Sequence, residues 1–201
     1  MNRIVVLAGS RRAGCWAFEK MFFRQYVIDK FVPALGLCYF CRKLIIMKFT
    51  EQKLKGAFII EPQVFGDSRG YFMESYKKEL FDRYIGPVDF IQDNESRSSY
   101  GVLRGLHFQR GQWSQAKLVR VTEGRVYDVI VDLRRSSPTF GQYMGVELSD
   151  ENKRQLFVPR GFAHGFAVLS ETAQFCYKVD NVYAPQAEVT LLYNDPHVGV
   201  E

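Results

Sequence analysis

The sequence predicts an all-β protein, an antiparallel sandwich or barrel for which the jelly roll is the natural candidate. From residue 48 onward, the chain runs in short alternating stretches of polar and apolar residues that end at turn-forming glycines and prolines. Aromatic residues make up 15% of the chain, which suits β-structure around a concave interior. Only Lys77–Arg83 has a helical pattern of any length.

The predicted strands follow one another at short intervals. The first, Ala57–Ile60, ends at a Glu-Pro pair. Lys117–Val121 leads through a Thr-Glu-Gly turn into Arg125–Leu133, and two period-two runs joined in this way predict a hairpin. Four further strands are predicted, at Tyr143–Leu148, Gln155–Val158, Gly165–Leu169 and Ala173–Val179. The length of 201 residues suits a single domain.

Charge separates the first 46 residues from the rest. Residues 1–46 hold eight Lys/Arg and two Asp/Glu, whereas residues 47–201 hold nineteen and twenty, so the net charge of +5 comes from the first segment. The near-neutral main part argues against a nucleic-acid partner. Residues 1–46 contain neither a membrane-spanning run nor a signal-peptide pattern, although a basic amphipathic segment that touches membranes is an alternative. We interpret Met47 as the natural start of the domain, and residues 1–46 as an extension outside it.

Four cysteines, Cys15, Cys38, Cys41 and Cys176, do not form a disulfide framework, because three of them lie in the first segment. A reducing, cytoplasmic location is therefore expected. Cys38 and Cys41 have zinc-ligand or redox spacing. We interpret them as two cysteines in an apolar segment, because no second pair and no nearby histidine completes a site.

Two of the three histidines, His107 and His164, have unusual neighbours. If Val102–Gln109 is a strand, Gly105, His107 and Gln109 share one face. Taken alone, each histidine is more simply interpreted as a structural residue whose polar groups are satisfied. No His-x-His pair and no carboxylate at ligand spacing accompanies them, which disfavours a metal site. The chemical role that remains is proton transfer near neutral pH.

Lys117 and Tyr177 are polar residues inside predicted strands. A solvated edge lysine is the plain alternative for Lys117. With His107 they would supply a base, an acid and a cation, the groups that invert a carbon next to a ketone. Arg69 and Arg104 are candidates for anion recognition, although a local surface pair between Asp67 and Arg69 explains the first equally well.

Taken together, these segments resemble the dTDP-4-dehydrorhamnose 3,5-epimerase family. The resemblance runs in order from about Met47 to Glu201. It is carried by Phe65–Ser75, Phe90–Ser98, Val102–Gln109, Lys117–Arg120, Val158–Leu169, Phe175–Lys178 and Asn194–Pro196.

The resemblance implies a cupin-type jelly roll (a double-stranded β-helix) that needs no metal or cofactor and forms a cytoplasmic homodimer. It implies inversion of C3 and C5 of dTDP-4-dehydro-6-deoxy-D-glucose, on the way to dTDP-L-rhamnose for polysaccharide biosynthesis. By resemblance, His107 is the general base, Tyr177 is the general acid, and Lys117 stabilises the enolate. The implied substrate contacts are Arg69, Glu74, Gln92, Asp93, Asn94, Arg104, Lys117, His164 and Glu188.

Two departures from the family pattern bear on activity. Residues 1–46 have no counterpart, and family members continue past the position of Glu201 with a segment whose aspartate orients the catalytic histidine. We therefore expect a domain of residues 47–201 that lacks its C-terminal segment. The alternatives are a catalytically inactive homologue that only binds a nucleotide sugar, and a related single-carbon sugar-nucleotide epimerase. Outside the isomerases, the alternative is a metal-dependent cupin oxygenase.

Overall fold

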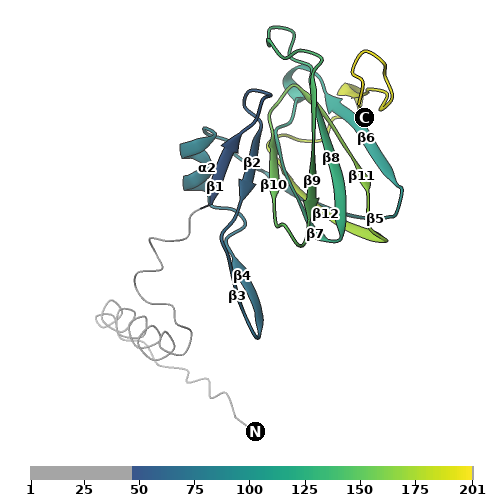
Figure 1. Ribbon diagram of the computed structural model, residues 1–201. Helices are drawn as coiled ribbons and strands as arrows, with labels where there is room; N and C mark the ends of the chain where they lie inside the picture. The colour runs from purple at the N-terminus through teal and green to yellow at the C-terminus, as the bar shows by residue number, and fades with distance from the viewer. Residues whose placement is uncertain (1–46, 201) are drawn as a thin grey trace, which may run out of the picture. The chain divides into compact units, whose positions relative to one another are not determined.

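Two antiparallel sheets face each other in the computed structural model, which describes residues 47–200 (Figure 1). The six-stranded sheet has the order β1 (Lys48–Glu51), β2 (Phe58–Glu61), β10 (Gln155–Val158), β7 (Lys117–Glu123), β12 (Thr172–Val179) and β5 (Gln92–Ser99). The five-stranded sheet has the order β13 (Glu188–Thr190), β6 (Leu103–Gln109), β11 (Phe162–Val168), β8 (Arg125–Asp132) and β9 (Tyr143–Ser149). The predicted all-β jelly roll is confirmed. The predictions for residues 1–46, including the Cys38–Cys41 pair, lie outside the described residues.

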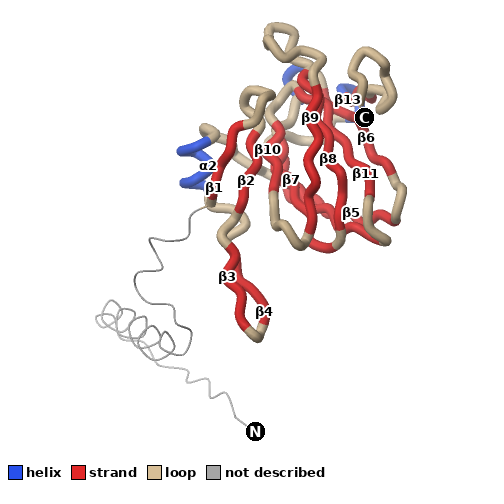
Figure 2. The backbone as a smooth tube through the Cα atoms, in the orientation of Figure 1, coloured by secondary structure: helices blue, strands red, loops and turns tan. Residues whose placement is uncertain are grey.

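Smaller elements surround the sandwich (Figure 2). A hairpin of β3 (Val64–Asp67) and β4 (Gly70–Met73) projects away from both sheets. Helix α2 (Lys78–Tyr84) follows it within one residue of the predicted bounds. Two short 3₁₀ turns, η2 (Gly111–Trp113) and η3 (Pro185–Ala187), lie in the connections at one end of the sandwich.

The apolar core lies between the sheets because every second residue of each strand points inward. Val119 and Val121 of β7 are buried there, and Phe175 of β12 stacks on Phe166 of β11 with ring centroids 4.2 Å apart. Burial of each such side chain contributes about 1.5–3 kcal/mol. The same alternation on β7 points Lys117 to the interior, in line with Val119 and Val121.

The predicted hairpin of residues 117–133 is wrong. Strand β7 pairs with β10 and β12, whereas β8 pairs with β9 and β11, so the turn at Gly124 carries the chain from one sheet to the other. Alternation shows that a strand buries one face, and it does not show which strand lies beside it. Gly124 has a φ of 76°, and a Cβ there would overlap the carbonyl oxygen of Thr172. A glycine is therefore required where the chain crosses tightly from one sheet to the other.

Candidate active site

Side chains from three strands meet in a cavity of about 330 Å³ at one end of the sandwich. Lys117 is the first residue of β7, Tyr177 lies near the end of β12, and His107 lies near the end of β6. His107 comes from the five-stranded sheet and the other two come from the six-stranded sheet. The rest of the lining is Gln92, Asn94, Phe108, Gln109, Ser114, Gln115, Phe162, Val179, Tyr183 and Glu188.

His107 is the half-buried imidazole of this cavity. Its Nε2 lies 3.3 Å from Nζ of Lys117, and its ring centroid lies 6.4 Å from that of His164. Burial lowers the pKa of His107 to about 3, with further electrostatic lowering by Lys117 and His164. The imidazole is therefore unprotonated at neutral pH, and its lone pair can accept a proton.

Lys117 and Tyr177 both carry their protons at neutral pH, whereas His107 does not. Burial lowers the pKa of Lys117 to about 8, whereas the carboxylates of Asp128 and Glu188 raise it. Lys117 therefore carries its charge at neutral pH and begins to lose it just above. Burial raises the pKa of Tyr177 above its usual value, opposed by the charge of Arg104, so the phenol keeps its proton.

Behind His107 lies a buried hydrogen-bonded pair, His164 and Asp128, that the sequence did not predict. Asp128 is fully buried, and its two carboxylate oxygens lie 3.1 and 3.0 Å from Nε2 of His164. This arrangement assigns the Nε2 proton of His164 to Asp128. A signal was present in the sequence, because a lone carboxylate inside the apolar run Val126–Val131 needs a buried partner.

The predicted substrate contacts divide into two groups. Gln92, Asn94 and Glu188 line the cavity together with His107, Lys117 and Tyr177. Asp93 does not, because strand alternation turns it to the other face of β5, where it pairs with Nζ of Lys178 at 2.7 Å. Two other predicted contacts, Arg104 and His164, are also outside the cavity lining; Arg104 donates to Oγ of Ser98 at 3.0 Å.

Arg69 and Glu74 lie on or next to the projecting hairpin and do not line the cavity. Arg69 pairs with Asp67 at the tip of the hairpin, as the surface-pair alternative predicted. Glu74 follows β4. Within residues 47–200, its Oε2 is the one buried side-chain oxygen or nitrogen without a hydrogen-bond partner.

Two features are absent from residues 47–200. In this part of the chain, no group of three or more His, Cys, Asp or Glu is arranged to hold a metal ion. In the same residues, no helix is long and apolar enough to cross a membrane.

A jelly roll with a histidine, a lysine and a tyrosine around one cavity has the groups that an acid–base isomerase needs. A family model described as dTDP-4-dehydrorhamnose 3,5-epimerase matches residues 51–201, and the chain belongs to this family. The dTDP-4-dehydrorhamnose 3,5-epimerase of Salmonella typhimurium is 58% identical over 157 residues, which cover 78% of this chain and 86% of the relative.

Two solved structures show the range of the likeness. A dTDP-6-deoxy-D-glucose-3,5-epimerase from Legionella pneumophila, in complex with dTDP-4-keto-L-rhamnose, is 48% identical with a TM-score of 0.75; the match covers 78% of this chain and 83% of that one. A 3′-monoepimerase from Streptomyces bikiniensis, in complex with dTDP-quinovose, is 32% identical with a TM-score of 0.71, covering 75% and 76%. The solved structures similar to this chain therefore include proteins named for inversion at one carbon and at two.

Proposed function

We propose that this protein inverts C3 and C5 of dTDP-4-dehydro-6-deoxy-D-glucose to give dTDP-4-dehydro-L-rhamnose, a step of dTDP-L-rhamnose biosynthesis that serves polysaccharide formation. The observation that carries the proposal is the meeting of His107, Lys117 and Tyr177 in one cavity of a chain that is 58% identical to a 3,5-epimerase. Inversion at both carbons is favoured over inversion at one by the higher identity to relatives named for two.

His107 is the proposed general base. It takes the proton from the carbon next to the ketone, the electron pair of that C–H bond forms the enolate double bond, and the ketone oxygen gains the negative charge. Tyr177 then gives its phenolic proton to the opposite face of the same carbon, which inverts it. His107 then loses its extra proton to water, and the Tyr177 phenolate regains a proton from water. Both groups return to their starting states, and the cycle repeats at the second carbon.

Lys117 is the proposed cation that stabilises the enolate oxygen. Burial lowers the pKa of His107 to about 3, and the charge of Lys117 contributes to this lowering, so His107 begins as a weak base. Once negative charge develops on the ketone oxygen beside Lys117, that charge offsets the ammonium, and His107 binds its new proton more strongly. Base strength therefore rises during the step that needs it, an electrostatic contribution that favours the transition state over the bound substrate.

The remaining binding residues are assigned by their positions. Gln92, Asn94 and Glu188 are proposed to contact the sugar nucleotide from the cavity wall. Arg104 and His164 are proposed to act from just behind that wall, with Asp128 orienting the ring of His164. No cofactor is proposed, because a base, an acid and a cation suffice for this chemistry.

We further propose that the protein is a homodimer in which the β3–β4 hairpin reaches the site of a second copy. The hairpin exposes Tyr71 and Phe72, which are 58% and 59% exposed, and projects from its own sandwich (Figure 1). Contact with a second copy would cover these rings and bring Arg69 to a diphosphate.

The dimer proposal is tested by mixing two inactive variants, Arg69→Ala and His107→Ala. If the hairpin serves the other subunit, one of the two sites in a mixed dimer has both residues intact, and activity returns to about half per mixed dimer. If each site uses its own hairpin, every site keeps one defect, and mixing restores nothing. Sedimentation of the unmixed protein tests the dimer itself.

We place the enzyme in the cytoplasm, since the described domain carries one cysteine, Cys176, and its proposed substrate is a nucleotide sugar. The domain is proposed to span residues 47–201, in agreement with a family match that begins at residue 51.

The reaction is tested by proton NMR of dTDP-4-dehydro-6-deoxy-D-glucose incubated with the purified chain. The expected product has changed coupling constants at both C3 and C5. A product changed at C3 alone would establish the single-carbon alternative. Unchanged substrate that still binds the folded protein would establish the binding-only alternative.

A further inference from the structure

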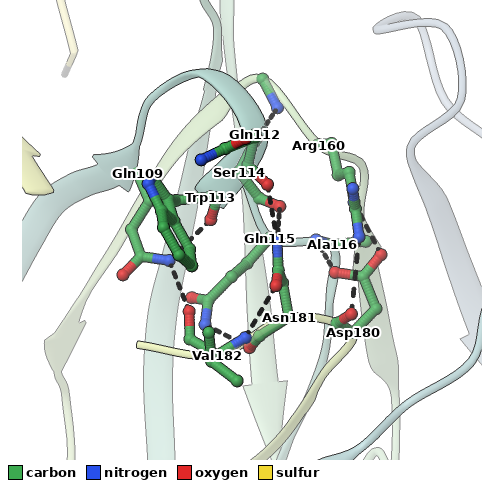
Figure 3. A network of polar contacts seen from close by, with 11 residues as sticks. Gln109, Gln112, Trp113, Ser114, Gln115, Ala116, Arg160, Asp180, Asn181 and Val182 are labelled. Atoms are coloured by element: carbon green, nitrogen blue, oxygen red, sulfur yellow. Dashed lines mark hydrogen bonds and ion pairs between the residues drawn. The ribbon is translucent and has the colours of Figure 1, made fainter. Parts of the chain in front are cut away.

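Two chain segments cross between the sheets at the cavity end of the sandwich, and hydrogen bonds tie them to each other (Figure 3). Residues 109–116 lead from the end of β6 in the five-stranded sheet to the start of β7 in the six-stranded sheet. Residues 180–184 leave β12 of the six-stranded sheet and continue through η3 to β13 of the five-stranded sheet. We call these two segments together the crossover clasp.

The bonds of the clasp follow both segments residue by residue. Oδ1 of Asp180 accepts from the backbone N–H of Ala116 at 2.7 Å, directly before Lys117. Nδ2 of Asn181 donates to the carbonyl of Ser114 at 3.3 Å, and Nε2 of Gln115 donates to the carbonyl of Asn181 at 2.7 Å. The two crossings are therefore held side by side along their lengths.

Gln109 closes the clasp at the β6 end, and its side chain is 6% exposed. Its Nε2 donates to the carbonyls of Trp113 at 2.7 Å and Val182 at 3.0 Å, and its Oε1 accepts from the backbone N–H of Ala184 at 2.6 Å. A glutamine amide has two N–H donors, so both are used within the protein. The side-chain amide of Gln109 thus joins the two crossings, and its N–H donors are not available to a ligand.

The position of Gln109 matters because the proposed base and acid belong to different sheets. Gln109 follows His107 by two residues on β6, and it forms hydrogen bonds with residues 182 and 184, in the segment that follows β12 and Tyr177. The clasp is therefore a polar link between the two walls of the cavity, formed at their connections. We propose that Gln109 is a positioning residue that sets the spacing between His107 and Tyr177 across the cavity. This inference rests on the proposed function.

A change in that spacing alters the fate of the enolate. After His107 has removed a proton, Tyr177 can protonate the opposite face, which gives inversion. His107 can instead return a proton to the face from which it came, which gives isotope exchange without inversion. If the walls move apart, delivery by Tyr177 slows, whereas return by His107 does not, because the enolate stays beside the base.

The experiment measures this partition in heavy water for Gln109→Met, which removes all three hydrogen bonds at similar side-chain length. The ratio of deuterated unreacted substrate to inverted product is read by mass spectrometry and NMR. Both the deuterated substrate and the inverted product come from folded sites, so the ratio does not depend on the fraction of a variant that is folded. We expect the ratio to rise about tenfold with KM within about threefold, because a misplacement of about 1 Å can cost about 100-fold in rate.

Asn152→Ala is the matched control. The Asn152 side chain also makes three hydrogen bonds to the backbone, with Ser149, Arg154 and Glu147. It lies in the turn before β10, whereas the cavity residue Lys117 pairs with Val158 at the other end of that strand. The control is expected to lower stability without changing the ratio.

Gln109→Glu tests the loss of the two N–H donors at an unchanged side-chain size, because a carboxylate cannot donate to the two carbonyls. It is expected to raise the ratio as Gln109→Met does; a wild-type ratio in either variant overturns the inference. An equal rise in Asn152→Ala also overturns it, since any loss of stability would then suffice. A wild-type protein that neither exchanges nor inverts contradicts the proposed function, and the inference falls with it.

Discussion

Replacement of Lys117 by methionine tests the electrostatics of the site. Lys117 is 7% exposed, and its Nζ lies 3.3 Å from Nε2 of His107. An ammonium about 3 Å from an enolate oxygen contributes about 5 kcal/mol at an effective dielectric constant of about 20. Part of this is recovered in the variant, because the pKa of His107 rises once the neighbouring charge is gone. The net loss is expected to be about 3–4 kcal/mol, or about 10²–10³-fold in kcat.

The pH profile makes this prediction specific. The charged form of Lys117 is the active one and its pKa is about 8, so wild-type kcat/KM is expected to fall as the pH rises through about 8. Lys117→Met has no such group, and its profile is expected to stay flat until Tyr177 ionises above its usual range. The variant is also expected to fold at least as stably, since burial of a charge is costly.

The assay is the initial rate of epimerisation between pH 6 and 10, with Arg120→Met as the control from the same strand. Arg120 lies three residues along β7 and lines a different cavity, so its variant is expected to keep the wild-type profile. A Lys117→Met variant within about threefold of the wild-type rate, or with the same fall above pH 8, would refute this role for Lys117.

Three further predictions follow from the same contacts. Tyr177→Phe is expected to lower inversion by about 10²–10⁴-fold while deuterium still enters unreacted substrate; loss of both would place Tyr177 in proton removal as well. The folded pKa of His107 lies below its unfolded value of about 6.5, so its contribution to stability is lost as the pH falls below that value, by at most about 1.4 kcal/mol per pH unit. Urea unfolding of His107→Asn at pH 6.5 and 5 is expected to show a smaller loss than wild type, and an equal loss would contradict it. Asp132→Asn removes a buried carboxylate that accepts from Arg134 and two hydroxyls, and is expected to cost about 3 kcal/mol of stability with kcat unchanged.

Strands that bury one face were predictable from the sequence because the alternation is visible. Gln155–Val158 was predicted with the bounds that the structure has, and Ala173–Val179 within one residue. Strand β5, Gln92–Ser99, was not predicted, because it lies at a sheet edge and is polar on both faces. The false hairpin at residues 117–133 has a different cause: pairing partners depend on the second sheet, and local spacing carries no information about that sheet.

The site was partly predictable for a similar reason. His107, Lys117 and Tyr177 stood out as polar residues within strands, and the structure brings all three to one cavity. Asp128 was not singled out, and Gln109 was noted only as sharing a strand face with His107, because each acts on a partner far along the chain, at His164 and at Val182. Their importance follows from burial and from hydrogen bonds that only the fold reveals.

Deuterium uptake from heavy water into dTDP-4-dehydro-6-deoxy-D-glucose, read at C3 and C5 by mass spectrometry, tests the central claim most directly. With this chain as the sole catalyst, uptake is expected at both carbons and is expected to disappear in His107→Ala. Absence of uptake from a folded sample, or uptake that persists in His107→Ala, would contradict the assignment of His107 as the base of an epimerase.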